Sequence, residues 1–244
     1  MIQVNDLSIS FGDEPVLRKI NFSLRENKTL SVLGKSGCGK TTLLKSIAGI
    51  QNNYSGSVEI NGEPVDQLKP QDRGVVYLYQ EPLLFPHLNV EQNIGFGLKI
   101  RKTDPAVIRQ KVDKMIQQLH LEGQEKKMPD QLSGGQKQRV AFGRAFIIHP
   151  KVLLLDEPFG SLDSDTRKEM QNLFIEISNT EKITTIFVTH DLKEALLTGD
   201  YFGMMHNGKI NIFENRDAFI NNADTGVKEE LKFWTNLTNK HVKQ

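Results

Sequence analysis

Residues 34–41 have the types and spacing of a loop that binds phosphate. They read Gly-Lys-Ser-Gly-Cys-Gly-Lys-Thr, which fits the pattern G-x-x-x-x-G-K-[ST] in full. Glycines let backbone N–H groups turn inward around an anion, and a helix starting near Lys40 would direct its positive end there. Lys40 adds a charge for the outer phosphates, and the Thr41 hydroxyl suits Mg²⁺, which prefers oxygen ligands. We predict that phosphates are bound by Gly34, Lys35, Ser36, Gly37, Cys38, Gly39, Lys40, Thr41 and Thr42.

The surroundings of this phosphate loop (residues 34–41) argue against a chance glycine-rich turn. A short apolar run, residues 30–33, precedes it, and apolar residues at helical spacing, Leu43 to Ala48, follow it. The motif requires this context of strand, loop and helix. Cys38 could be a redox thiol, but its place among small residues favours simple packing.

A second apolar run, Val152–Leu155, delivers two acids, Asp156 and Glu157. Ligands of open α/β sheets bind at the carboxyl ends of the strands. Asp156 could hold Mg²⁺ there, directly or through water. Glu157 points elsewhere by strand alternation, which suits a base that polarises the water attacking the γ-phosphate. A buried strand entering a solvated loop is the plainer alternative, and the phosphate loop earlier in the chain argues against it.

Predicted strands and helices alternate along the chain, and these elements must position the residues described above. Apolar runs at 30–33, 152–155 and 184–189 indicate strands, and helical spacing follows Asp104-Pro105 and recurs at 170–177. Such alternation predicts a mainly parallel sheet covered by helices. Alternating residues at 2–9 and 20–24, with hairpin turns expected at Asn61-Gly62 and Asn207-Gly208, predict antiparallel strands beside it. We therefore expect an α/β fold with a phosphate-loop core and an N-terminal antiparallel β-subdomain.

The stretch between about Pro82 and Pro150 is mostly helical and interrupts the alternation. We expect one domain over residues 1–244, with a nucleotide-binding core and β-subdomain formed by residues 1–81 and 151–213. Residues 82–150 would form an inserted helical subdomain. Residues 214–244 would form a helical tail, because Val227, Leu231, Trp234 and Leu237 recur at helical spacing.

The inserted segment contains a second helix start that could bind an anion. Residues 132–136, here called the signature segment, read Leu-Ser-Gly-Gly-Gln and precede a helical run. One γ-phosphate needs only one such loop in a chain, so we expect the signature segment to complete the site of another copy. The residues concerned are Ser133, Gly134, Gly135 and Gln136.

With these motifs the chain resembles the ATP-binding cassette (ABC) ATPases, whose signature is LSGGQ. The resemblance covers about residues 2–213 and implies further roles. Phe11 stands where the family usually places an aromatic residue on adenine, and a buried core phenylalanine is the alternative. Gln80 matches the glutamine that reaches Mg²⁺ and the attacking water, and His190 matches the switch histidine at the γ-phosphate. Asp163 lies in Ser161-Leu162-Asp163, the loop that crosses between two cassettes.

The resemblance implies ATP and Mg²⁺ as ligands and a head-to-tail pair, either a homodimer or a pair with a second ABC subunit. Catalysis would fall to Lys40, Gln80, Glu157 and His190, with Thr41, Gln80 and Asp156 at the metal. The family also implies an integral membrane permease, and a substrate-binding protein if the chain serves import. Residues 81–94 look like those of bacterial importer subunits for ferric iron, polyamines, molybdate, sulfate or thiamine. Residues 83–87 would be a docking patch for the permease, unless they are core.

The amino-acid composition argues against several other classes of protein. Lys and Arg number 31 against 30 Asp and Glu, which gives no basic excess for nucleic acid. A single cysteine fits a reducing compartment. We expect no signal peptide and find no apolar run near the ~20 residues that span a bilayer. The expected location is therefore cytoplasmic, on the inner face of the membrane. The alternatives are non-transport ABC ATPases of DNA repair or of the ribosome, which carry a long coiled coil or a second cassette.

Overall fold

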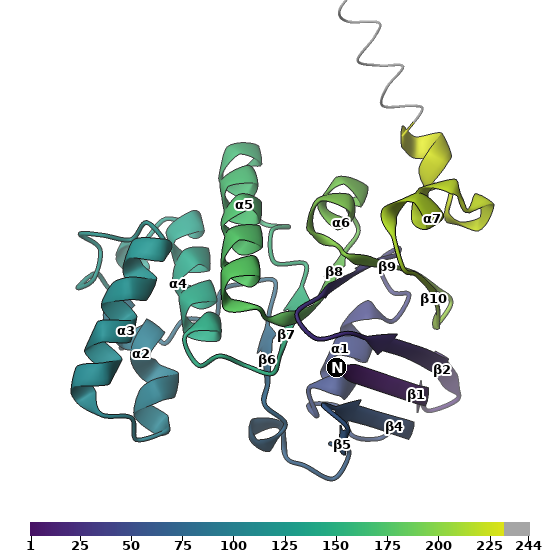
Figure 1. Cartoon of the computed structure of the whole chain (residues 1–244), viewed down its shortest axis with the longest axis horizontal. Helices are drawn as coiled ribbons and strands as arrows, with labels where there is room; N and C mark the ends of the chain where they lie inside the picture. Colours follow the sequence, from purple (N-terminus) through teal and green to yellow (C-terminus); the bar gives the residue numbers. More distant parts are fainter. Residues whose placement is uncertain (232–244) are drawn as a thin grey trace, which may run out of the picture.

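The computed structural model describes residues 1–231 and contains two sheets with helices around them (Figure 1). The first has the strand order β2-β1-β4-β5, and the second has the order β10-β9-β3-β8-β7-β6. The expectation of a mixed α/β fold with a mainly parallel sheet, an N-terminal antiparallel sheet and a helical insertion is confirmed.

The antiparallel sheet is built from β1 (Ile2–Phe11), β2 (Glu14–Leu24), β4 (Ser55–Ile60) and β5 (Glu63–Pro64). β1 is one strand with an irregular register. Its register with β2 shifts between Val4 and Leu7, where Asp6 has a left-handed φ of 48°. The turn that follows consists of Gly12 and Asp13, because Glu14 already belongs to β2.

The larger sheet runs parallel from β9 to β6 and places the phosphate loop. Its parallel strands are β3 (Thr29–Leu33), β6 (Val75–Leu78), β7 (Val152–Asp156), β8 (Thr184–Thr189) and β9 (Tyr201–His206). β10 (Lys209–Phe213) returns antiparallel to β9 through the expected Asn207-Gly208 turn, where both residues have positive φ. Every residue of β3 and β8 is buried, as expected for strands with covered faces.

Alternate residues of β7 enter two different cores. Val152 and Leu154 pack with α1 (Lys40–Ile47) and the antiparallel sheet, so α1 lies between the two sheets (Figure 1). Leu153 and Leu155 pack on the other face with α4 (Gly134–Phe146) and α5 (Ser164–Glu181). This alternation aims Asp156, the last residue of β7, toward α1.

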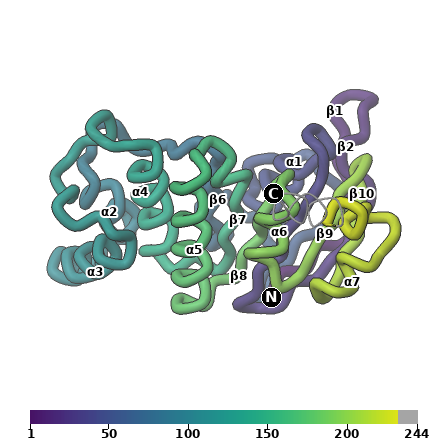
Figure 2. The backbone as a smooth tube through the Cα atoms, turned by 90° about the horizontal axis from the view of Figure 1, so that it is seen from above, coloured from purple at the N-terminus to yellow at the C-terminus, as the bar shows by residue number. Residues whose placement is uncertain are grey.

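Between β6 and β7 the chain leaves the sheet and forms α2 (Val90–Ile100), α3 (Pro105–Gln118) and α4. Asn89 and Asp104 cap the first two of these helices with their side chains, and Pro105 takes the first helical position of α3 as expected. The three helices gather on one side of α5, away from the antiparallel sheet, in both views (Figures 1 and 2). The subdomain boundaries themselves remain predictions.

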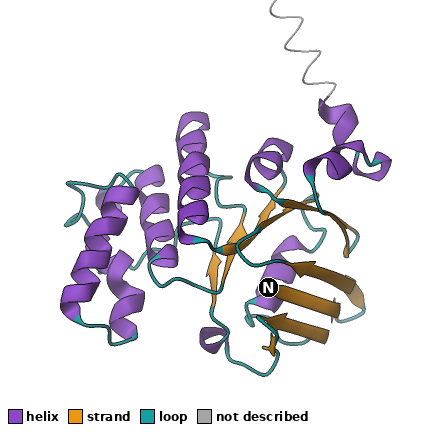
Figure 3. Cartoon of the chain, in the orientation of Figure 1, coloured by secondary structure: helices purple, strands orange, loops and turns teal. Residues whose placement is uncertain are grey.

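The remaining helices of the described residues are α6 (Leu192–Thr198), α7 (Arg216–Asn221) and a helical turn at 227–231. Phe219 of α7 stacks on Phe202 of β9 at a centroid distance of 5.0 Å, which anchors α7 on β9. The helices of this part lie beside the end of the larger sheet (Figure 3). Trp234 and Leu237 of the expected tail helix lie outside the described residues. In residues 1–231, no helix has both the length and the apolar character to cross a bilayer.

Candidate functional site

The phosphate loop joins β3 to α1 at the carboxyl edge of the parallel sheet. Gly39 has a φ of 110°, and a Cβ there would come within 2.9 Å of the Leu17 and Met205 side chains, so only glycine fits. Lys40 is 5% exposed, and its Nζ donates to the carbonyls of Gly34 at 2.7 Å and Lys35 at 3.2 Å. The lysine ammonium is therefore held inside the loop, where incoming phosphate oxygens can replace the carbonyls.

Asp156 lies beside the start of α1. Its Oδ1 accepts a hydrogen bond from the Thr41 hydroxyl at 3.2 Å, and its Oδ2 accepts one from the Tyr77 hydroxyl at 2.5 Å. Burial, together with the bond to Asp156, raises the pKa of the Tyr77 hydroxyl, so this phenol stays protonated and donates. The two bonds fix the orientation of the carboxylate.

Glu157 reaches the same site by a change of backbone direction. Strand alternation would send its side chain to the opposite face from Asp156, but β7 has ended and Glu157 has a left-handed φ of 47°. Its Oε1 lies 3.7 Å from Lys40 Nζ, and its Oε2 lies 2.7 Å from Nδ1 of His190. The structure thus brings the acid, the lysine and the histidine together. Glu157 and His190 directly follow the parallel strands β7 and β8, and Lys40 begins α1.

Two other expected site residues, Gln80 and Phe11, form no hydrogen bond or ion pair with these groups in the described chain. Gln80 is exposed, and a Cβ built on Gly160 would lie 3.1 Å from its side-chain nitrogen, so the amide sits over the loop that follows Glu157. No hydrogen bond joins Gln80 to Thr41 or Asp156 in the described chain. Phe11 is 48% exposed at the end of β1, so the alternative of a buried core residue is wrong.

The signature segment forms the expected helix start. Ser133 accepts from the Gln136 backbone N–H at 3.2 Å, and the Gln136 side chain accepts from the Ser133 N–H at 3.0 Å, a complete capping box. A Cβ on Gly135 would come within 2.5 Å of the Thr166 methyl, whereas Gly134 faces open space. In both views α4 and α1 lie on opposite sides of β7 (Figures 1 and 2). Within one chain, the signature segment is therefore remote from the phosphate loop.

The crossing loop, residues 161–163, leads into α5. Asp163 caps this helix, and its Oδ1 accepts from the backbone N–H groups of Asp165 at 3.2 Å and Thr166 at 3.1 Å. The Thr166 hydroxyl, together with these backbone N–H groups, lowers the pKa of the Asp163 carboxyl, which keeps it ionised. Asp163 is thereby held on the surface at the start of α5.

Sequence reasoning missed several residues that support the site. Tyr77 holds Asp156, and the buried Gln138 of α4 donates to the Pro158 carbonyl at 2.8 Å, joining the signature helix to the loop after Glu157. Thr189 and Glu194 form a buried pair behind His190. No local pattern marks these positions, because each partner is brought in by the packing of another element.

A phosphate loop at the carboxyl edge of a parallel sheet, beside a strand-borne acid, defines the class of P-loop nucleotide-binding proteins. The family model described as ABC transporter matches residues 17–160, more than half of the chain. The chain belongs to the ABC transporter family.

Named relatives agree with this assignment. The chain is 43% identical over 209 residues to the sulfate/thiosulfate import ATP-binding protein CysA of Synechocystis, covering 86% of this chain and 59% of that one. It is 44% identical over 210 residues to the spermidine/putrescine import ATP-binding protein PotA of Acetivibrio thermocellus, covering 86% and 60%. The chain thus spans about three fifths of these relatives. A probable CysA of Chlorella vulgaris is 40% identical, with 86% and 89% covered.

A solved structure shares the fold. The cbiO1 protein of Clostridium perfringens, described as part of the ABC transporter complex cbiONQ, superposes with a TM-score of 0.82 at 28% sequence identity. The match covers 93% of both chains. This agreement extends over both sheets and the helical insertion.

Proposed function

We propose that this chain is an ATP-hydrolysing subunit that energises import of a substrate through a membrane permease. The main support for the proposal is that the Glu157 carboxylate contacts both Lys40 and His190 at the phosphate loop. Thr41 and Asp156 lie beside them. The import ATP-binding proteins among the relatives support the transport role.

The arrangement suits hydrolysis of the γ-phosphate. Lys40 and the loop N–H groups would hold the phosphates and offset charge on the oxygens. Glu157 would accept a proton from water as the water oxygen bonds to the γ-phosphorus, while the bond to the bridging oxygen breaks and ADP leaves with those electrons. His190, hydrogen-bonded to Glu157, would orient that carboxylate and contact the γ-phosphate. Phe11 would offer an exposed aromatic face to adenine, and Gln80 would reach in from above Gly160.

The residues present also fit Mg²⁺. Thr41 Oγ1 and Asp156 Oδ1 lie 3.2 Å apart, and a hydroxyl beside a carboxylate supplies the oxygen ligands that Mg²⁺ prefers. These oxygens would hold the ion together with phosphate oxygens, and Gln80 is the further candidate. Bound there, the ion would neutralise charge on the β- and γ-phosphates.

The signature segment supports a shared site. Its helix start is capped and exposed, yet it cannot serve the phosphate loop of its own chain because α5 and β7 lie between them. We therefore place Ser133, Gly134, Gly135 and Gln136 on the nucleotide of a second copy or a second ABC subunit, with Asp163 at the same junction. ATP bound between two chains would close the pair, and hydrolysis would open it.

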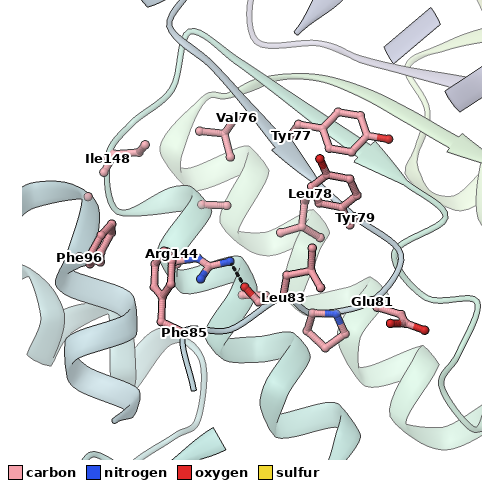
Figure 4. Close-up of a pocket in the computed structure, with 14 residues that line it drawn as sticks. Val76, Tyr77, Leu78, Tyr79, Glu81, Leu83, Phe85, Phe96, Arg144 and Ile148 are labelled. Atoms are coloured by element: carbon pink, nitrogen blue, oxygen red, sulfur yellow. Dashed lines mark hydrogen bonds between the residues drawn. The ribbon is translucent and has the colours of Figure 1, made fainter. Parts of the chain in front are cut away.

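A groove near Gln80 provides a docking surface for the permease. A cavity of about 310 Å³ lies between β6 and α4, and Leu83 at its edge is 56% exposed (Figure 4). The Arg144 guanidinium lies 4.7 Å above the Phe85 ring and donates to the Leu83 carbonyl at 2.6 Å. An apolar helix end of the permease fits this chemistry.

Two variants test the proposal. Lys40→Ala should abolish measurable ATP binding in calorimetry, because it removes the buried charge of the phosphate loop. Ser133→Arg should leave ATP binding to the monomer intact while blocking ATP-dependent dimers and turnover. Unchanged affinity in the first variant, or unchanged ATPase in the second, would refute the corresponding part.

Co-purification from membranes tests the transport role and the inner-face location. An associated permease, with or without a substrate-binding protein, is the expected result. Salt-sensitive binding to DNA or ribosomes would instead favour a non-transport ABC ATPase. The relatives serve sulfate/thiosulfate or spermidine/putrescine at similar identity, so the co-purified subunits are what would identify the cargo.

A further inference from the structure

A buried polar network lies behind His190, on residues that the proposed mechanism does not use. Glu194 of α6 is 5% exposed, and its Oε2 accepts from the Thr189 hydroxyl at 2.7 Å. The Thr189 oxygen in turn accepts from the backbone N–H of Asp191 at 3.0 Å. Thr189 precedes His190 and Asp191 follows it, so one carboxylate holds the backbone on both sides of the histidine.

The other oxygen of Glu194 faces α5. Gln171 Nε2 donates to Oε1 at 3.2 Å, and Arg167 Nε lies 3.9 Å from the same oxygen. Arg167 Nη2 donates to the Leu162 carbonyl at 3.0 Å, in the middle of the crossing loop. The buried Nε of Arg167 makes no hydrogen bond within the described chain, which leaves Glu194 as the acid that balances its charge.

Fold stability alone does not account for a carboxylate at this position. Burying an acid is costly unless it is paired and hydrogen-bonded, and apolar residues of similar volume often serve as well. His190, by contrast, needs fixing, because its side chain is 59% exposed and yet meets Glu157 Oε2 at 2.7 Å. With more than half of the side chain in solvent, the direction of the ring depends largely on the Thr189–Asp191 backbone.

We propose that Glu194 is a positioning residue that couples the crossing loop to His190. The inference rests on the proposed function, in which a second copy contacts the crossing loop. Contact there would shift the Leu162 carbonyl, and Arg167 and Glu194 would pass that shift to Thr189. The imidazole would then align with Glu157 only when the two chains have closed, which restricts hydrolysis to the paired state.

Single variants of the full-length chain test each link. Glu194→Gln keeps the size of the side chain but presents an amide to Arg167, Thr189→Val removes the bridging hydroxyl, and Arg167→Met releases Leu162. Each should lower kcat by about 10-fold to 100-fold, the scale of a small misalignment at a reacting centre. The KM for ATP and nucleotide binding to the monomer should stay unchanged. Lys168→Met, at an exposed neighbouring position of α5, is the matched control and should behave like wild type.

The double variant Glu194→Gln/Arg167→Met separates coupling from two independent defects. If the residues act in one chain of contacts, the double variant should be no slower than the slower single variant. A loss equal to the product of the two single losses would overturn the proposal, as would unchanged kcat in folded single variants. If Glu194→Gln fails to fold, Thr189→Val and Arg167→Met carry the same test.

A measurement without turnover distinguishes failure of this inference from failure of the proposed function. NMR spectra are recorded on the nucleotide-free chain labelled at histidine Cε1, and the His190 resonance is assigned from its absence in His190→Gln. This resonance should shift in Thr189→Val and Glu194→Gln. It should stay in place in Lys168→Met. An unmoved resonance in folded variants would refute the positioning role. Wild-type protein without any ATPase activity, but with the expected resonance shifts, would instead count against the proposed function alone.

Discussion

Replacing Glu157 by glutamine removes the proposed base and changes little else. The amide has the same shape as the carboxylate, and the left-handed backbone at φ 47° stays as it is. The amide can still hydrogen-bond to Nδ1 of His190, which lies 2.7 Å from the carboxylate of the wild-type chain. The negative charge that lies 3.7 Å from Lys40 Nζ disappears, so the phosphate loop becomes more favourable for an anion.

The expected loss in rate follows from the role. General-base catalysis typically contributes 10²–10⁴-fold, which corresponds to about 3–6 kcal/mol in the activation free energy at ~1.4 kcal/mol per tenfold. ATP affinity should stay equal or become tighter, because Glu157 opposes rather than holds the phosphates. The variant should therefore form an ATP-bound pair that persists, since the nucleotide joining the two chains is not cleaved.

Phosphate release measures the rate, calorimetry measures the affinity, and light scattering after gel filtration measures the mass. Glu63→Gln, at an exposed residue whose partner is Lys151, is the matched control and should resemble wild type in all three. A Glu157→Gln protein that hydrolyses ATP at more than about a tenth of the wild-type rate would refute the base assignment.

Three further outcomes follow from the packing. Arg73 is 1% exposed and donates to four backbone carbonyls, two of them at the end of α1, so Arg73→Met should lower the free energy of unfolding by about 3–5 kcal/mol in urea titrations. Gly135→Ala should lower the free energy of unfolding by about 1–3 kcal/mol, because its Cβ would meet the Thr166 methyl, whereas Gly134→Ala should leave that free energy unchanged. Adding Thr166→Ser to Gly135→Ala should restore the lost stability, and failure of that rescue would contradict the explanation. Burial raises the pKa of the Glu194 carboxyl, so the folded chain keeps this proton to higher pH than the unfolded chain and loses stability as pH rises past about 4.5. Glu194→Gln should therefore gain in Tm relative to wild type between pH 4 and pH 7, and a gap that does not change with pH would be evidence against it.

Local chemistry made the phosphate loop and the sheet predictable. The glycines and Lys40 mark the loop within eight residues, and the apolar run of β7 fixes which face Asp156 takes, because period-two alternation continues to the end of the strand. Strand alternation did not predict the direction of the Glu157 side chain. That residue lies past the end of β7, and its left-handed backbone turns it back toward Lys40.

Contacts between distant elements were not predictable. Tyr77 precedes Asp156 by 79 positions, and Gln171 precedes Glu194 by 23, so only the folded sheet and helices bring these pairs together. The shift in β1 at Asp6 likewise depends on its neighbours, because the Asn21 side chain accepts from the Asp6 backbone N–H at 2.9 Å. The roles assigned to individual site residues remain predictions that the variants above examine.

The central claim is that each nucleotide is held by the phosphate loop of one chain and the signature segment of another. A crystal structure of Glu157→Gln with ATP and Mg²⁺ measures this directly. We expect two chains related head to tail, with Ser133 Oγ and the Gly135 N–H of one within hydrogen-bonding distance of the γ-phosphate on the other. A single chain with bound ATP and Ser133 in open solvent, together with a monomeric mass at high protein concentration, would contradict it.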